Sequence, residues 1–305
     1  MSWIIQVIID GLSLGSFYAL AALGIGLLFG VLRLINFAHG MFITVGAFSL
    51  IIPSMNVKAT PFIGAFNPLF LIISVVILIA ILALISEFTV FRPLRKASDS
   101  TLMVGSFALG FILQNLVIII YGGRPKAIGL WPDLSLGVQI MENVSVPRLQ
   151  FFIIFTTIFL MGCLVLFLKK TKWGIHMRAA AEDFQMARML GVKANLVIML
   201  AVAISGGLAA AVSLLFVVQT GILDFRMGTN LMLFAFIATV IGGMGSLLGA
   251  VVGGFTVGFV SIVFQSFLPG EIKVYRDVFV FLIVILILLV RPQGIVLSST
   301  AKERV

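Results

Sequence analysis

The sequence is poor in charge. Only 10% of its 305 residues are Asp, Glu, Lys or Arg, whereas 61% are hydrophobic. A soluble globular domain carries roughly 25% charged residues. A soluble fold of this length has too small an interior to bury so much apolar surface. The composition therefore predicts an integral membrane protein.

Groups that support catalysis or metal binding are also scarce. The chain has one cysteine, Cys163, and two histidines, His39 and His176. A single cysteine allows no internal disulfide, and the sequence has no HExxH or CxxC motif, so we expect no metal site. It also lacks a GxxxxGK[ST] phosphate-binding loop and a dinucleotide-binding glycine motif. No Ser/His/Asp set can be assembled with any consistency. We therefore expect neither an enzyme nor a bound cofactor.

Acidic residues are almost missing from the apolar runs, where only Asp10 and Glu87 occur. Transporters driven by protons or sodium usually need carboxylates within the membrane. This scarcity weighs against a secondary transporter and suggests that energy for any transport comes from elsewhere. The net charge of +9 does not indicate nucleic-acid binding, because Lys and Arg form short clusters between apolar runs rather than a basic stripe with interleaved aromatics.

Apolar runs of membrane-spanning length repeat along the chain. A helix needs about 20 apolar residues to cross a bilayer. The expected spans lie near 3–30, 34–52, 69–91, 101–122, 149–168, 196–219, 229–243, 247–268 and 278–292. No connector is long enough for a separate domain. We predict an all-α polytopic membrane protein with about 8–9 transmembrane helices, forming a single transmembrane domain over residues 1–305.

The first apolar run and the distribution of Lys and Arg indicate how the chain enters the membrane. No basic residue precedes the first apolar run, and Asp10 interrupts it, so we expect a first span rather than a cleaved signal peptide. Most Lys and Arg residues fall in connectors on the same side as the C-terminus, above all in the segment 169–195. Cytoplasmic loops carry this excess. The C-terminus is therefore expected in the cytoplasm.

Two polar or glycine-rich stretches interrupt the apolar runs: "INFAHG" at 35–40 and "IGGMGS" at 241–246. Polar groups at membrane depth occur mainly where they face protein or a wet cavity. Broken segments in two halves of a chain point to a transport pathway. The pathway-lining candidates are Asn36, Phe37, His39, Gly40, Gly242 and Gly243. The alternative is that Asn36 and His39 only brace a bend.

Glycines also recur at four-residue spacing, at Gly245, Gly249 and Gly253. This spacing stacks them on one helix face and allows close helix packing. Part of that surface is alternatively a contact between subunits or a moving wall of the pathway.

The segment 169–195 resembles a cytoplasmic connector with a short amphipathic helix. Helix-forming residues dominate 176–190, and Gly191 suits a C-terminal cap. Ala180, Phe184, Ala187 and Gly191 are expected on one face. Such a helix lies on lipid or docks into a groove of a soluble partner. Small alanine-rich faces favour the docking interpretation.

Four motifs in this order resemble the permeases of branched-chain amino-acid ABC importers of the Liv type, in particular the shorter permease of the pair. They are "NFAHG", "AEDFQMARMLGV", "GGMGS" with its following glycines, and "LLVRPQGI". The resemblance covers about Gly11 to Ile295. It implies a permease of the bacterial inner membrane that pairs with a second, homologous permease subunit. It also implies two cytoplasmic ABC ATPase subunits that carry ATP and Mg, and an extracytoplasmic solute-binding protein.

The resemblance assigns the segment 169–195 to ATPase coupling. The candidate residues are Arg178, Ala181, Glu182, Asp183, Phe184, Met186 and Gly191. Their order departs from the EAA---G pattern of other importers. A urea or short-chain amide ABC permease is a near alternative, because "NFAHG" does not separate the two. A secondary transporter acting alone and a non-transport membrane scaffold are the more remote alternatives.

Overall fold

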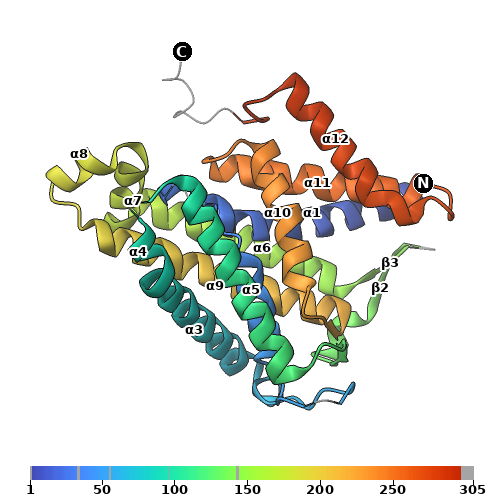
Figure 1. The fold of residues 1–305 in the computed structure, drawn as a ribbon. Coiled ribbons are helices and arrows are strands. Elements are labelled where there is room, and N and C mark those ends of the chain that lie inside the picture. Colours follow the sequence, from blue (N-terminus) through green and yellow to red (C-terminus); the bar gives the residue numbers. More distant parts are fainter. Residues whose placement is uncertain (1, 33–34, 55, 96, 142–143, 297–305) are drawn as a thin grey trace. The chain divides into compact units, whose positions relative to one another are not determined.

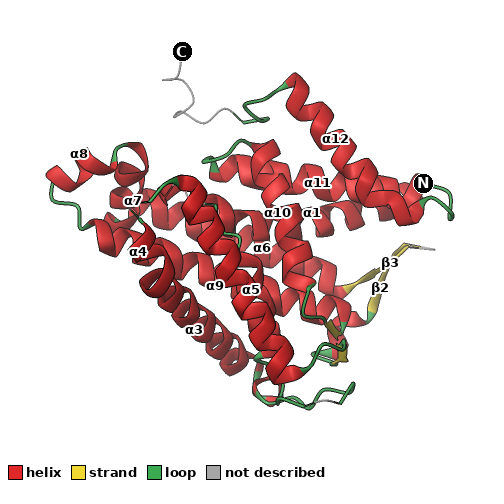
Figure 2. Cartoon of the chain, in the orientation of Figure 1, coloured by secondary structure: helices red, strands yellow, loops and turns green. Residues whose placement is uncertain are grey.

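The computed structural model describes residues 2–32, 35–54, 56–95, 97–141 and 144–296 (Figure 1). Helices dominate this part of the chain, and the strands are short (Figure 2). The α-helices are α1 (Ser2–Leu32), α2 (His39–Phe48), α3 (Pro68–Ser86), α4 (Arg92–Leu94), α5 (Asp99–Tyr121), α6 (Arg148–Lys170), α7 (Lys172–Glu182), α8 (Phe184–Met189), α9 (Ala194–Thr220), α10 (Met227–Gly242), α11 (Leu247–Phe267) and α12 (Arg276–Val290). A π-helical turn, η2 (Glu87–Phe91), joins α3 to α4, and short 3-10 turns lie at η1 (Ile63–Ala65), η3 (Pro132–Ser135) and η4 (Lys273–Tyr275).

Each expected span contains a helix, although the span expected near 34–52 holds only the ten residues of α2, and this confirms an all-α polytopic membrane protein. The helices long and apolar enough to cross a membrane are α1, α3 continued through η2 and α4, α5, α6, α9 and α11. The apolar helices α2 and α10 have 10 and 16 residues, and α12 has 15. These three are shorter than the roughly 20 residues that a perpendicular crossing needs.

Several helices begin at capping residues that are visible in the sequence. The side chain of Asn67 accepts a hydrogen bond from Leu69 N, and Pro68 occupies the first position of α3. Ser98 caps α5 by accepting from Thr101 N, and Ser246 caps α11. These oxygens satisfy amide groups that have no partner within the helix. Local sequence therefore sets where these helices start.

The chain divides into two compact units. Unit 1 comprises Met1–Gly26, Pro132–Val165 and Leu233–Val305, and unit 2 comprises Leu27–Trp131 and Leu166–Met232. Three of the four boundaries fall inside α1, α6 and α10, and the fourth lies between Trp131 and Pro132. Neither unit is therefore one continuous stretch of sequence.

Glycines bring the helix backbones of unit 1 close together. A Cβ atom at Gly254 would overlap the backbone of Ala19 in α1, and one at Gly258 would overlap that of Gly15. On another side of α11, a Cβ at Gly253 would overlap the carbonyl of Ala238 in α10. Small residues let membrane helices approach in this way. Unit 1 also holds an antiparallel hairpin of β2 (Gly137–Met141) and β3 (Val144–Pro147).

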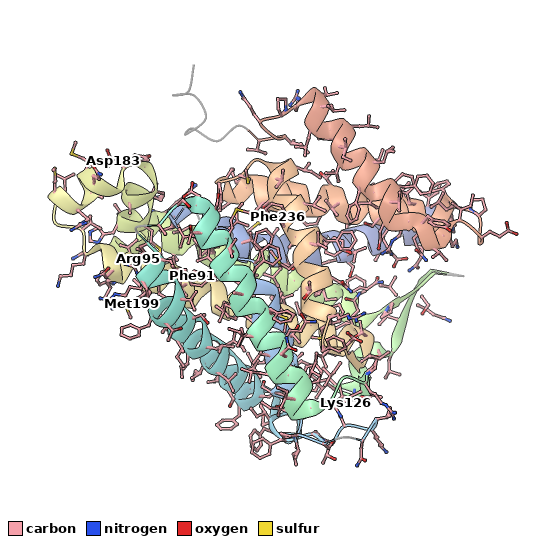
Figure 3. The ribbon with its side chains drawn as sticks, viewed as in Figure 1. Phe91, Arg95, Lys126, Asp183, Met199 and Phe236 are labelled. Atoms are coloured by element: carbon pink, nitrogen blue, oxygen red, sulfur yellow. The ribbon has the colours of Figure 1, made fainter. Side chains whose placement is uncertain are left out.

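Unit 2 is built around α9, which packs along α3 and against α2. The helices α4, α7 and α8 lie at one end of this unit (Figure 1). At its other end β1 (Lys126–Ala127) pairs antiparallel with β4 (Ile222–Leu223). There the buried Lys126 donates to the carbonyl oxygens of Ser54 and Asn56, at 2.5 and 2.8 Å. Figure 3 labels Asp183 near the first end and Lys126 at the second.

Candidate functional site

The break at 35–40, called the bend below, is a tight turn between α1 and α2. The Asn36 side-chain oxygen accepts a hydrogen bond from Ala38 N at 2.9 Å, and the Asn36 carbonyl accepts one from His39 N at 3.2 Å. Asn commonly closes turns through its own side chain in this manner. Asn36 is 1% exposed. Its side-chain oxygen therefore satisfies one backbone amide of the bend.

Helix α5 anchors the bend from one side. The hydroxyl oxygen of Ser106 accepts a hydrogen bond from Phe37 N at 3.2 Å. The Phe37 ring stacks on Phe107, with 4.2 Å between centroids and 20° between planes. A serine and an aromatic one position apart thus fix the backbone and the side chain of the same residue.

Helix α9 holds the bend from another side through His39. The imidazole is fully buried, and its Nδ1 lies 3.2 Å from the hydroxyl of Ser205. Its Nε2 has no hydrogen-bond partner among the described residues. An unpartnered buried polar atom costs about 1–3 kcal/mol. Nε2 is therefore available to a polar group that reaches it.

Helix α10 contacts α2 at Gly40, the residue after His39. A Cβ at Gly228 would overlap the carbonyl of Gly40, and Thr44 Oγ1 accepts a hydrogen bond from Gly228 N at 3.1 Å. Both positions therefore require glycine for space. The crossing places two helix backbones in contact within one turn of the imidazole.

The structure thus brings Asn36, His39 and Gly40 together with α5, α9 and α10. Asn36, His39 and Gly40 are buried, whereas Phe37 is half-buried. Bracing of the bend and lining of a pathway both stay predictions. Sequence reasoning missed the partners Ser106, Ser205 and Gly228. Their signal was small or polar residues within long apolar runs.

The second break, at 241–246, is completed by the end of the described chain. Gly243 and Gly245 have φ values of 105° and 90°, in the left-handed region that favours glycine. The amides of Ile295 and Val296 donate to the carbonyls of Ile241 and Gly242, at 2.7 and 3.0 Å. Those carbonyls lie at the end of α10, where partners within the helix are missing. The "GGMGS" and "RPQGI" motifs therefore form one local structure.

This arrangement corrects the expectation for Gly245. The four-residue spacing placed it on a helix face with Gly249 and Gly253, but α11 begins at Leu247 and Gly245 lies in the preceding turn. A Cβ at Gly249 would overlap Gly242 of α10, and one at Gly243 would overlap Val296. The pathway candidates Gly242 and Gly243 are thus packed against their own chain.

The segment 169–195 contains two helices where the sequence predicted one over 176–190. The prediction is wrong at Asp183, whose backbone is extended and whose carboxylate accepts hydrogen bonds from Gln185 N and Met186 N, at 2.8 and 2.9 Å. Aspartate competes with helical bonding in this way and favours caps. Gly191, with φ 86°, follows the end of α8 as predicted.

Burial in this segment differs from the predicted face. Ala180 and Ala187 are each 4% exposed, so the small-residue face turns toward its own chain. The exposed apolar side chains are Met186, Met189 and Leu190, at 55%, 84% and 79%. Their i, i+3, i+4 spacing puts them on one side of a helical turn. We call these three residues the α8 patch.

The other coupling candidates take varied positions. Arg178 donates through Nε to the carbonyl of Leu168 at 3.1 Å, which ties α7 to the end of α6. Ala181 is half-buried, and Glu182 is exposed. Phe184 begins α8, and its side chain lies outside the described residues. The described residues contain no group of His, Cys, Asp and Glu that could hold a metal ion.

Comparison with known proteins places this architecture in a family. The family described as "Branched-chain amino acid transport system / permease component" matches residues 7–289. The permease protein BraD of the high-affinity branched-chain amino acid transport system of Pseudomonas aeruginosa is 32% identical over 300 residues, covering 95% of each chain. The corresponding LivH of Escherichia coli K12 is 30% identical over 302 residues, covering 96% of this chain and 95% of the relative.

The similarity extends to an archaeal sequence. The probable branched-chain amino acid transport permease LivH of Methanocaldococcus jannaschii is 28% identical over 295 residues, or 90% of this chain and 87% of the relative. No solved structure matches the chain. The family and full-length matches agree with the motifs and with the apolar helices. The chain belongs to the family of permease components of branched-chain amino acid transport systems.

Proposed function

We propose that this chain is the membrane permease subunit of an ABC importer for branched-chain amino acids. The observation that carries the proposal is the match along nearly the whole chain to relatives named as permeases for these solutes. The family match over residues 7–289 covers both the bend and the segment 169–195. ATP hydrolysis then occurs on separate subunits.

The charge distribution of unit 2 supports an orientation in the cell membrane. The end that carries α4, α7 and α8 (Figure 1) holds more Lys and Arg residues than the other end. Its basic residues are Arg92, Arg95, Lys169, Lys170, Lys172, Arg178, Arg188 and Lys193, against Lys58, Arg124, Lys126 and Arg226 at the other end. Cytoplasmic loops carry such an excess. This end is therefore cytoplasmic in the proposal, and so is the C-terminus, which itself lies outside the described residues.

The α8 patch is the proposed docking surface for the ATPase subunits. Exposed Met189 and Leu190 are surrounded by exposed polar residues, among them Gln185 and Arg188. An apolar turn with a polar rim suits insertion into a groove of a protein. Methionine adapts its shape to such contacts. A solute-binding protein delivers the solute at the opposite end, and a second permease subunit completes the pathway.

The bend is the proposed pathway element. It combines a helix break with a buried imidazole, and it is held by three separate helices. A bend held by separate helices changes shape when those helices move. In a Cys163→Ala background, cysteines at 36 and 39 should react with small water-soluble thiol reagents in one nucleotide state and not in another. Two cysteines that stay inert in every state would leave bracing as the role of the bend.

Reconstitution tests the function itself. The chain would be co-expressed with the second permease, the ATPases and the binding protein that the proposal requires, and placed in proteoliposomes. We expect ATP-dependent uptake of labelled leucine, isoleucine and valine, and none with an ATPase-inactive subunit. Uptake of urea or acetamide in place of leucine would refute the substrate. Uptake by this chain alone on a proton gradient would refute the ABC class.

A further inference from the structure

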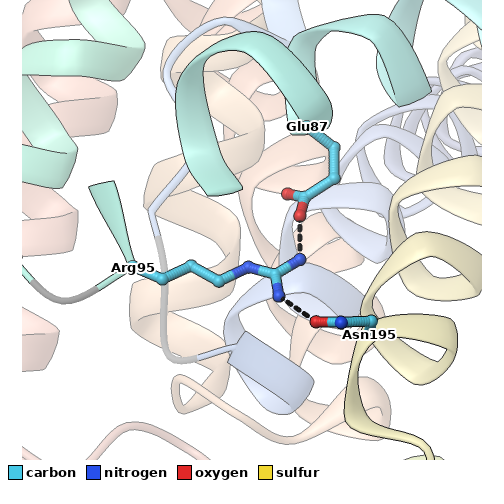
Figure 4. A network of polar contacts seen from close by, with 3 residues as sticks. All are labelled: Glu87, Arg95 and Asn195. Atoms are coloured by element: carbon cyan, nitrogen blue, oxygen red, sulfur yellow. Dashed lines mark hydrogen bonds and ion pairs between the residues drawn. The ribbon is translucent and has the colours of Figure 1, made fainter. Parts of the chain in front are cut away.

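Arg95 lies where three elements of unit 2 meet. It follows α4 directly, and one terminal amino group of its guanidinium contacts the carboxylate of Glu87. The other amino group donates to the side-chain oxygen of Asn195 at 2.6 Å (Figure 4). One side chain thus connects the end of the α3–η2–α4 helix to the start of α9.

The ion pair between Arg95 and Glu87 is partly buried. Glu87 is 2% exposed, and a buried carboxylate needs a charged partner to offset the loss of water. It begins the π-helical turn η2, an irregularity that occurs often at functional positions. The other ion pair in the described part of the chain joins the sequence neighbours Arg276 and Asp277. The Arg95–Glu87 pair is thus the one described ion pair that links separate elements.

The Asn195 contact attaches Arg95 to the segment 169–195. Asn195 is the second residue of α9, and only a short connector with Gly191 separates it from α8. Ten residues further along α9, Ser205 contacts the imidazole of His39. Because only Leu190–Lys193 separate α8 from α9, a displacement of α8 is transmitted to Asn195, and α9 carries it toward the bend.

A second route leads from Arg95 to the bend through α5. Leu94, the preceding residue, packs so closely on Gly105 that its Cδ1 lies 2.6 Å from the position of a Cβ there. The next residue of α5 is Ser106, which holds Phe37 N. Helices α5 and α9 thus both contact the bend, and both also contact Arg95 or its neighbour Leu94.

We propose that Arg95 is a positioning residue that couples movement of the α8 patch to the bend by tying α9 and α5 together. This role rests on the proposed function, because it needs an ATP-driven partner that moves α8. The chemistry suits arginine in particular. Its planar fork serves two acceptors in fixed directions, whereas a lysine ammonium is a point charge on a flexible stem.

The test uses the complete importer in proteoliposomes, with ATP hydrolysis and leucine uptake measured on the same samples. Asn195→Ala removes one contact and keeps the buried pair, and Asn195 is exposed, so this variant should fold. Arg95→Lys keeps the charge and removes the fork. Arg92→Lys is the matched control, because Arg92 is exposed, its guanidinium lies over the Phe88 ring at 5.4 Å, and lysine keeps the positive charge that acts on nearby Glu87.

The Asn195→Ala and Arg95→Lys variants should both assemble with the ATPases and hydrolyse ATP at rates close to that of the unmodified importer. Their uptake per ATP hydrolysed should fall about tenfold, a size common for coupling between distant sites. The Arg92→Lys ratio should not change. A purely structural role predicts that assembly, hydrolysis and uptake fall together, and that result would overturn the proposal, as would normal uptake in both variants. If the unmodified importer fails to assemble or take up leucine, the proposed function fails first.

Discussion

Replacement of Gly228 by alanine tests the helix crossing behind His39. The new Cβ would fall on the carbonyl group of Gly40 and on Thr44 Oγ1. A carbonyl belongs to the backbone and cannot rotate away, so α2 and α10 must separate. Overpacking of this kind costs about 1–3 kcal/mol. Alanine also gains up to about 1 kcal/mol of helix propensity over glycine. Because the clash is with backbone, we take the upper end of that overpacking cost, and subtracting about 1 kcal/mol of helix propensity leaves a net loss of about 2 kcal/mol in the free energy of unfolding.

The assay is reversible unfolding of the purified chain in mixed micelles, with increasing fractions of a denaturing detergent. A loss of about 2 kcal/mol lowers the folding equilibrium constant roughly 30-fold, which is easily resolved. Gly162→Ala is the matched control, because it lies within α6 and a Cβ there meets nothing within 4 Å. This control should be neutral or stabilise by about 0.4–1 kcal/mol. Equal stability of the two variants would refute the close crossing at Gly40.

Three further predictions concern the segment 169–195 and the bend. Ala181→Pro removes a helical amide of α7 at a cost of about 3 kcal/mol. Uptake and co-purification with the ATPases should be lost, whereas membrane insertion, measured by fractionation, should be normal. Asp183→Ala removes the two capping hydrogen bonds of α8, which should destabilise this helix by about 1 kcal/mol and lower uptake. Asp183→Asn keeps a capping oxygen and should retain uptake, and equal uptake in the two variants would contradict the capping role. His39→Gln should keep part of the uptake and His39→Leu less, because only glutamine can bond Ser205; the reverse order would exclude a polar role.

Much of the helical architecture follows from sequence, because a run such as 69–91 has no stable alternative in a bilayer. Backbone groups in lipid must bond within their own segment, so long apolar runs become helices. Caps such as Asn67 and Ser98 act on neighbouring amides, and they are therefore readable locally. Gly191 was predicted for the same reason. The breaks at 35–40 and 241–246 were visible because glycine and asparagine are unusual in such runs.

Tertiary structure alone decided which faces point inward. In water, apolar periodicity marks the buried side of a helix, but lipid-facing and protein-facing residues of a membrane helix are both apolar. The inward turn of Ala180 and Ala187 and the exposure of Met189 depend on the break at Asp183, where a side chain displaced helical bonding. Arg95 and Asn195 are 100 residues apart in sequence. Only the packing of α9 along α3 brings them together, because no local rule reaches that far.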